Sequence, residues 1–135
     1  MGVPELLRRS PLFAEFDDEK LERLAAPFSE VEFPEDHVLI EARTPGAGLF
    51  VVCEGTVVVE ARGWKRELGP GEVVGEISLV EDDGLRRARV VATSPVRCLA
   101  LTRSEFEQML EAEPELAEAM RELARQRLAE LEASG

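Results

Sequence analysis

The middle of the chain, from about residue 30 to residue 102, consists of short runs in which apolar side chains alternate with polar ones. Successive side chains in a strand point to opposite faces of a sheet, so this alternation is typical of strands with one buried face. The alternating positions are Val31/Phe33, Val38/Ile40, Leu49/Val51/Cys53, Val57/Val59 and Val96/Cys98/Ala100. Turn-forming residues separate the runs, and eight of the ten glycines lie between Gly46 and Gly84. Many short strands with frequent turns predict a β-sandwich or a jelly-roll barrel.

Helical spacing replaces the alternation at both ends of the chain. Pro4 suits the first turn of a helix, and Asp17 is placed to cap a second one. Residues 102–105 have the capping-box pattern, and Pro114 suits the start of a last helix. That helix carries an apolar stripe of Leu116, Met120, Leu123, Ala124, Leu128 and Leu131. We expect one domain over residues 1–135, mainly β with flanking helices in 1–29 and 103–133.

The net charge of −12 limits what the chain can bind. Nonspecific binding to nucleic acid or to anionic membranes needs a basic surface, so neither is expected. No stretch approaches the roughly 18 apolar residues of a membrane-spanning helix, and the N-terminus lacks the layout of a signal peptide. The two cysteines lie in strand-like runs, where we expect buried free thiols. Together these features predict a cytoplasmic protein. The lack of asparagine points to a thermophilic source, or alternatively to biased genome composition.

The segment from Gly71 to Val90 combines a Gly-Glu pair with an arginine ten residues beyond the glutamate. Gly75 has no Cβ, so the backbone there can approach a ligand closely. A helical turn starting near Glu76 would direct free N–H groups at an anion. Arg86 can hold a phosphate with its planar fork of donors, whereas the Glu76 carboxylate only accepts and suits a sugar hydroxyl. The pattern therefore indicates a site for a small anion that also carries hydroxyls.

The sequences Gly75-Glu76-Ile77-Ser78-Leu79 and Arg86-x-Ala88-x-Val90 resemble the phosphate-binding cassette of the cyclic nucleotide-binding domain family. That family includes the bacterial catabolite activator protein, the regulatory subunits of cAMP-dependent protein kinase and cyclic-nucleotide-gated channels. The resemblance implies a β-roll, a double-stranded β-helix of jelly-roll type, over 30–102, with the cassette at 71–90. It also implies a regulatory sensor that binds a cyclic nucleotide, with cAMP as the expected ligand, cGMP as the alternative and no further cofactor.

The residues that the resemblance assigns to the ligand are Gly75, Glu76, Ile77, Ser78, Arg86, Arg87 and Ala88. Arg86 would bind the phosphate, and Glu76 would bind the ribose 2′-hydroxyl. Each assignment has a structural alternative: Arg86 as a solvated loop arginine, Glu76 as a cap of the cassette turn, and Ser78 as a small residue needed for packing. Arg87 departs from the family pattern, which usually has a small or hydroxyl residue there. It could add a second cation, block the pocket or turn outward.

The resemblance also implies that ligand binding repositions the C-terminal helices over the base. The hydroxyl residues that contact adenine in catabolite-activator relatives are missing near Leu131, so Arg127 is the candidate base lid, with Arg125 as a second choice. The apolar stripe either packs on the β-roll or meets its mate in a homodimer. The chain stops at Gly135 without a helix-turn-helix, so we expect no direct DNA binding and an unknown downstream protein partner.

Two other hypotheses compete with a nucleotide sensor. A degenerate relative could serve as a protein-interaction module without nucleotide, which Arg87, Arg43 and the missing lid hydroxyl favour. An enzyme on a cupin-like barrel would need several histidines for a metal, and His37 is the only histidine. No nucleophile is paired with a base in the sequence either. We therefore expect no catalytic residues and no metal ligands.

Overall fold

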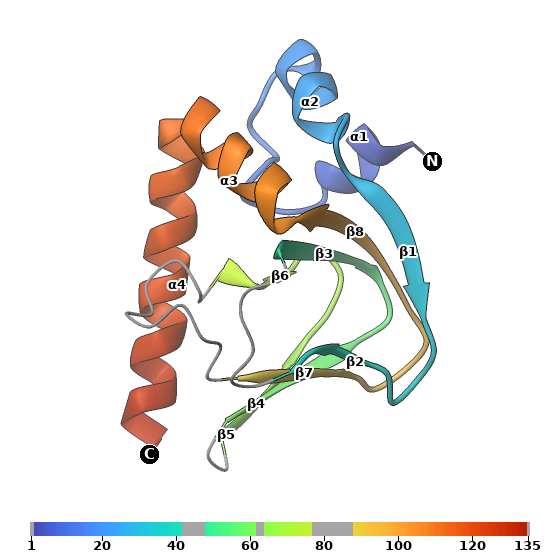
Figure 1. Cartoon of the computed structure of the whole chain (residues 1–135), viewed down its shortest axis with the longest axis vertical. Coiled ribbons are helices and arrows are strands. Elements are labelled where there is room, and N and C mark those ends of the chain that lie inside the picture. The colour runs from blue at the N-terminus through green and yellow to red at the C-terminus, as the bar shows by residue number, and fades with distance from the viewer. Residues whose placement is uncertain (1, 42–47, 62–63, 77–87, 135) are drawn as a thin grey trace.

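The fold is built on two four-stranded antiparallel sheets that face each other (Figure 1). The computed structural model describes residues 2–41, 48–61, 64–76 and 88–134. The strands are β1 (Ser29–Phe33), β2 (Val38–Ile40), β3 (Gly48–Glu54), β4 (Val57–Ala61), β5 (Trp64–Leu68), β6 (Val73–Val74), β7 (Arg89–Ala92) and β8 (Val96–Thr102). One sheet has the order β1-β8-β3-β6 and the other the order β2-β7-β4-β5. The predicted β-roll is thus confirmed.

The short strand β6 is positioned by its pairing with β3. Phe50 lies opposite Val74, and Val51 lies opposite Val73. Two further backbone bonds extend this contact, because the Val52 amide donates to the Glu72 carbonyl and the Gly71 amide donates to the Val52 carbonyl, at 2.9 and 2.8 Å. β6 is the last strand of its sheet, so the chain that follows it leaves the sheet at this edge.

Within the described residues, four helices flank the sheets, and their ends follow local capping rules. They are α1 (Val3–Leu7), α2 (Asp18–Ala25), α3 (Arg103–Ala112) and α4 (Pro114–Ser134). The Asp17 side chain accepts from the Lys20 amide at 2.8 Å, and Thr102 and Glu105 form both bonds of the predicted capping box. The Lys20 ammonium also lies 2.8 Å from a Glu113 carboxylate oxygen, which joins α2 to the junction between α3 and α4.

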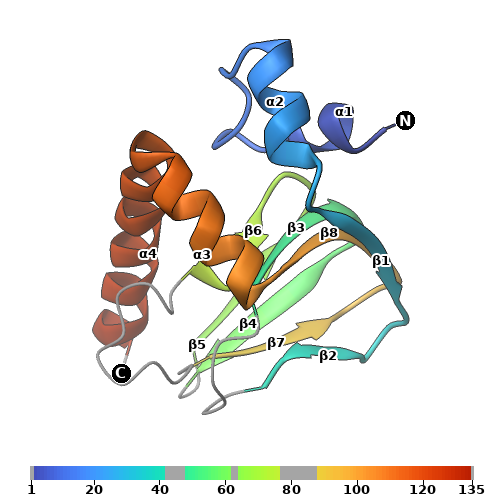
Figure 2. The same cartoon turned by 45° about the horizontal axis from the view of Figure 1, so that its top comes forward.

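The long helix α4 runs alongside the β-roll, on the side of the molecule where β6 and β5 lie (Figures 1 and 2). Leu116, Met120 and Ala124 are buried, and Leu123 is half-buried. Farther along, Glu130 forms an ion pair with Arg66 of β5 at 2.6 Å. Most of the predicted apolar stripe is therefore used for packing within the domain. A homodimer through this helix stays a prediction.

Two clusters of buried side chains form the core. The first joins the helices to one sheet and contains Leu7, Phe13, Leu49, Leu99 and Met120. The second lies between the sheets and contains Val52, Val57, Val90, Ala92 and Cys98. Cys53 and Cys98 are buried free thiols, as predicted. Burial raises the pKa of Cys53, and it raises the pKa of Cys98 to about 12. Both thiols are therefore protonated at neutral pH and chemically inert.

Candidate functional site

The candidate site begins where the chain leaves β6. Gly75 has a φ of 109°, a backbone conformation that side chains with a Cβ rarely adopt. This bend turns the chain out of the sheet, and Glu76 follows in a 3₁₀ turn. The sequence predicted a close backbone approach at Gly75 and a helical turn starting near Glu76. The bend at Gly75 lies in the described part of this segment, and the close approach to a ligand and the helical turn beyond Glu76 stay predictions.

The Glu76 carboxylate is buried and forms an ion pair with Arg127 of α4. One guanidinium nitrogen, Nη1, donates to Glu76 Oε1 at 2.6 Å, and the two side chains are only 2% and 5% exposed. A buried carboxylate is costly without a counter-charge, so Arg127 is the group that makes burial of Glu76 tolerable. The two residues are far apart in sequence, and their contact fixes α4 against the end of β6.

Arg127 makes two further contacts with the same edge of the sheet. Its Nη1 also donates to the Val73 carbonyl oxygen, and its Nη2 donates to Glu72 Oε2 at 2.7 Å. The planar fork of arginine can serve several acceptors at fixed angles, which a lysine ammonium does less well. One side chain of α4 therefore binds residues on both sides of β6, and we call this set of contacts the Arg127 clasp.

The clasp leaves two buried polar atoms without partners. Glu76 Oε2 and Arg127 Nε are both buried and form no hydrogen bond. Most buried polar atoms in proteins are hydrogen-bonded, and leaving one unsatisfied costs about 1–3 kcal/mol. The free oxygen can only accept, because an ionised carboxylate has no hydrogen to donate. A hydroxyl group brought by a ligand would satisfy it.

The other residues of the predicted site divide between described and undescribed positions. Ala88 is 7% exposed and belongs to the core cluster between the sheets, so its methyl group packs rather than facing solvent. Ile77, Ser78, Arg86 and Arg87 lie outside the described residues. Their assignment to the ligand stays a prediction. The guanidinium of Arg127 binds Glu72, Val73 and Glu76, and its predicted contact with a base stays a prediction too.

The sequence reasoning missed that Arg127 is buried and that Glu72 takes part. A signal for the first was present, because Arg127 follows Met120 and Ala124 at helical spacing and so falls on the apolar stripe. A charged residue in the middle of a buried stripe needs a buried counter-charge. The sequence alone offered many glutamates as partners, and only the fold selects Glu72 and Glu76.

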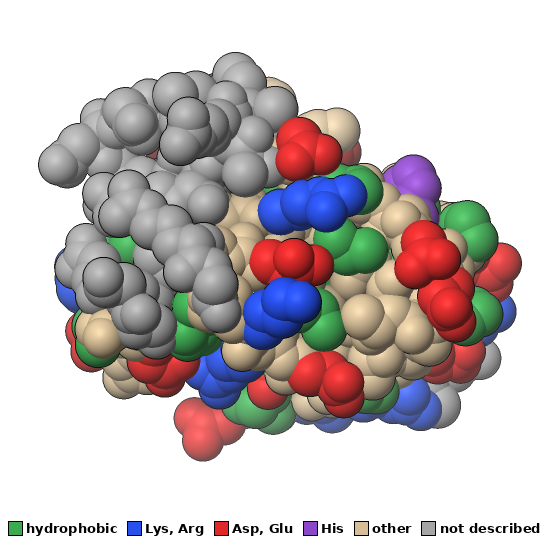
Figure 3. Space-filling view, turned by 90° about the horizontal axis from the view of Figure 1, so that it is seen from below, with side chains coloured by type: hydrophobic (Ala, Val, Ile, Leu, Met, Phe, Trp, Pro, Cys, Tyr) green, Lys and Arg blue, Asp and Glu red, His purple; other side chains and the backbone are tan. Residues whose placement is uncertain are grey.

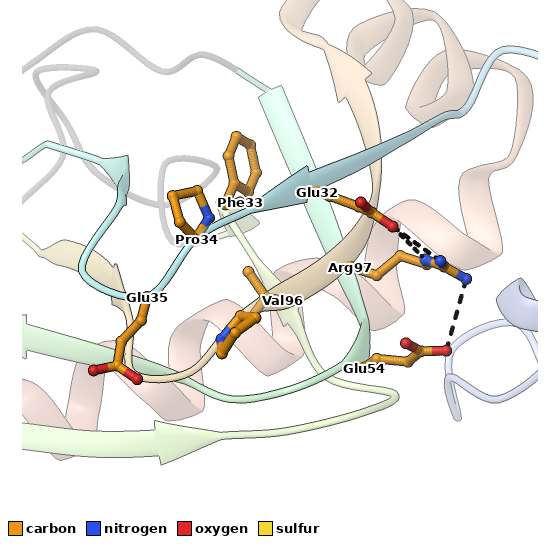
Figure 4. Close-up of a pocket in the computed structure, with 8 residues that line it drawn as sticks. Glu32, Phe33, Pro34, Glu35, Glu54, Val96 and Arg97 are labelled. Atoms are coloured by element: carbon orange, nitrogen blue, oxygen red, sulfur yellow. Dashed lines mark hydrogen bonds and ion pairs between the residues drawn. The ribbon is translucent and has the colours of Figure 1, made fainter.

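A separate groove of about 510 Å³ lies where β1 ends and β8 begins (Figure 4). Phe33, Pro34 and Val96 contribute its apolar surface. Its cation, Arg97, is already engaged, because it bonds Glu32 at 2.9 Å and pairs with Glu54 at 3.7 Å. The neighbouring carboxylates raise the pKa of Arg97 and keep it charged. This groove therefore has no free positive charge for an anion.

The surface charges agree with an acidic protein. In Figure 3, Lys and Arg side chains lie next to Asp and Glu side chains over the coloured part of the face. Within the described residues, no group of three or more His, Cys, Asp or Glu is arranged to hold a metal ion. The same residues include no helix that is both long and apolar enough to cross a membrane.

The chain is similar to known proteins along most of its length. The family model described as cyclic nucleotide-binding domain matches residues 30–113. A cyclic nucleotide-gated potassium channel of Mesorhizobium japonicum is 31% identical over 123 residues, which is 91% of this chain and 34% of the channel. The chain spans about a third of the length of the curated relatives that it matches.

Two solved structures show the same fold at higher coverage. The N-terminal domain of a transcriptional regulator from Streptomyces coelicolor is 37% identical, with a TM-score of 0.66 and 93% of both chains covered. The catabolite activator protein of Thermus thermophilus is 30% identical, with a TM-score of 0.75, and the match covers 93% of this chain and 61% of that one.

Proposed function

This chain belongs to the cyclic nucleotide-binding domain family, and from that premise we propose that it is a regulatory sensor whose ligand is cAMP. The observation that carries the proposal is the free, buried Oε2 of Glu76, next to the sharp backbone bend at Gly75. An acceptor-only group in that position suits the 2′-hydroxyl of a ribose. The phosphate would be bound by Arg86 and by backbone N–H groups of the cassette.

The clasp supports a route from the ligand to α4. A ribose hydroxyl that donates to Glu76 Oε2 adds a bond to the carboxylate that Arg127 already binds through Oε1. The geometry of that carboxylate then depends on the ligand, and Arg127 conveys the change to the helix. A ligand shifts such an equilibrium only by its different affinity for the two arrangements. We propose that cAMP favours one position of α4 over another.

The output of this movement goes, we propose, to another domain or to a separate protein in the cytoplasm. The matched relatives include a channel and a transcriptional regulator, in which the signal reaches different outputs. The chain itself is strongly acidic, which opposes direct contact with DNA. The two free thiols support a reducing compartment.

Thermal unfolding with cAMP, cGMP and 5′-AMP tests the function. A ligand at 100 times its dissociation constant stabilises the folded state by about 2.7 kcal/mol, which raises the melting temperature. We expect the largest rise with cAMP, a smaller one with cGMP and none with 5′-AMP, which lacks the ring-closed phosphate. No rise with either cyclic nucleotide would favour the second candidate, an interaction module that needs no nucleotide. The observation behind that candidate is that Arg127 already occupies Glu76 without a ligand.

A further inference from the structure

A second pocket lies next to the Arg127 clasp. It is enclosed by the N-terminal segment, the turn before β6 and helix α4. It has a volume of about 300 Å³, and Leu12, Val73 and Leu123 contribute apolar surface to it. Glu72, the half-buried partner of Arg127, is also part of its wall. This volume is at the lower end of the range for small-molecule sites, which are largely apolar with a few placed polar groups.

The wall between the N-terminal segment and the turn is closely packed. Gly71 has a φ of 90°, and a Cβ at this position would lie only 2.9 Å from the Arg9 carbonyl oxygen. Both features require glycine, because any side chain would strain the backbone and push the two segments apart. The residues after α1 are therefore held against the turn, and the pocket is part of the fold.

Ser10 is one of the residues that line this pocket, and its buried hydroxyl has no hydrogen-bond partner. The residue is 1% exposed, and its Oγ forms no hydrogen bond. A buried hydroxyl without a hydrogen-bond partner is uncommon. Its partner would be either a bound ligand or a trapped water molecule. Ser10 can donate one hydrogen bond to such a group.

Arg9, an exposed residue, also lines the pocket. Every other arginine that the structure describes lies within 4.0 Å of a carboxylate oxygen, whereas Arg9 forms no such pair. In a protein with a net charge of −12, an arginine without a carboxylate is an exception. Burial raises the pKa of the Cys53 thiol, and the positive charge of Arg9 lowers it in part. The carboxylate of Glu72 is paired with Arg127, which it shares with Glu76.

From these features we propose that the pocket is a second binding site, which takes a small organic carboxylate with an apolar body. Arg9 would bind the carboxylate, the Ser10 hydroxyl would donate to one of its oxygens, and the apolar body would lie against Leu12 and Leu123. This site does not depend on the proposed nucleotide function, and it is tested without nucleotide.

The experiment is an NMR titration of the ¹⁵N-labelled chain with benzoate, which joins a carboxylate to an apolar ring. Benzyl alcohol supplies the ring without the charge, and inorganic phosphate supplies the charge without the ring. We expect benzoate to shift the amides of Ser10, Gly71 and Leu123 with a dissociation constant of about 1–10 mM, as befits so small a ligand. Benzyl alcohol and phosphate are expected to bind at least about tenfold more weakly.

Three variants assign the contacts. Arg9→Gln is expected to weaken benzoate binding about tenfold, while Arg23→Gln, at an exposed arginine on α2, leaves it unchanged. Ser10→Ala removes an unsatisfied buried hydroxyl, so we expect a higher melting temperature for the free protein together with weaker benzoate binding. A residue with a merely structural role would change stability without changing the affinity for benzoate.

Three results would overturn the proposal. One is the absence of saturable shifts at these amides with benzoate, which would leave the pocket to water. Another is equal binding of phosphate and benzoate, which would indicate a surface charge effect. The third is unchanged benzoate affinity in both Arg9→Gln and Ser10→Ala.

Discussion

Glu76 and Arg127 are 51 residues apart in the chain, yet Glu76 Oε1 and Arg127 Nη1 lie 2.6 Å apart in the interior. One residue follows β6, and the other belongs to α4. Their contact places the candidate ligand acceptor and the helix that would carry the signal in a single buried pair. The consequences of that pairing can be measured.

The first prediction concerns stability. Arg127→Met leaves the Glu76 carboxylate buried without a counter-charge, and removal of one partner of a buried pair typically costs about 3–5 kcal/mol. We expect a loss of that size in the free energy of unfolding measured with urea. Glu76→Gln combined with Arg127→Met is expected to lose less than Arg127→Met alone. The matched control is Arg125→Met on the same helix, whose pairs are on the surface and worth about 0–1 kcal/mol. Equal losses for Arg127→Met and Arg125→Met would mean that the clasp is not a stabilising contact.

The second prediction concerns the phosphate. A hydrogen bond to a charged group contributes about 1.5–3 kcal/mol, so Arg86→Ala is expected to weaken cAMP binding at least about tenfold in a calorimetric titration. Arg87→Ala is the companion variant. Weaker binding in Arg87→Ala indicates a second cation, and tighter binding indicates a side chain that obstructs the pocket. Unchanged affinity in Arg86→Ala would remove that residue from the site.

The third prediction concerns pH. Burial raises the pKa of the Cys98 thiol to about 12, well above that of an exposed thiol. Above pH 9 the unfolded chain loses this proton and the folded protein keeps it, so stability is full below pH 9 and falls as the pH rises toward 12. The slope is about 1.4 kcal/mol per pH unit for one such group. We expect urea unfolding to show a steeper loss between pH 9 and pH 11 in the wild type than in Cys98→Ala. Parallel curves for the two proteins would contradict this.

The fourth prediction concerns the helix. If Arg127 conveys ligand binding to α4, then cAMP changes the hydrogen-exchange rates of amides in the second half of this helix. The change should persist in Arg125→Met and be much smaller in Arg127→Met, compared at saturating ligand. An undiminished change in Arg127→Met would mean that the signal reaches the helix by another route.

The sequence predicted local features well at positions where a single physical effect, such as helix capping, determines the type of residue. Asp17, Thr102, Glu105 and Pro114 mark helix starts by capping and by proline geometry, and all four are found in those positions. The alternating runs predicted β1, β2, β3, β4 and β8 for a similar reason, because side chains alternate between the two faces of a strand, but β5, β6 and β7 were not among them.

What the sequence could not supply were pairings across the fold. The apolar stripe on α4 was compatible with packing on the β-roll and with a dimer, and burial of Leu116, Met120 and Ala124 shows the first use. Arg127 was predicted near the base, whereas its guanidinium contacts Glu72, Val73 and Glu76. Selecting one of many glutamates as the partner of an arginine requires the distance between α4 and β6, which depends on the packing of the whole domain.

The most direct measurement is a calorimetric comparison of cAMP with 2′-deoxy-cAMP on the unmodified protein. The two ligands differ only in the hydroxyl that we assign to Glu76 Oε2, so neither protein stability nor folding affects the comparison. The account predicts that the deoxy ligand binds about 10- to 100-fold more weakly, as expected for a lost hydrogen bond to a charged group. Equal affinities for the two ligands would contradict it.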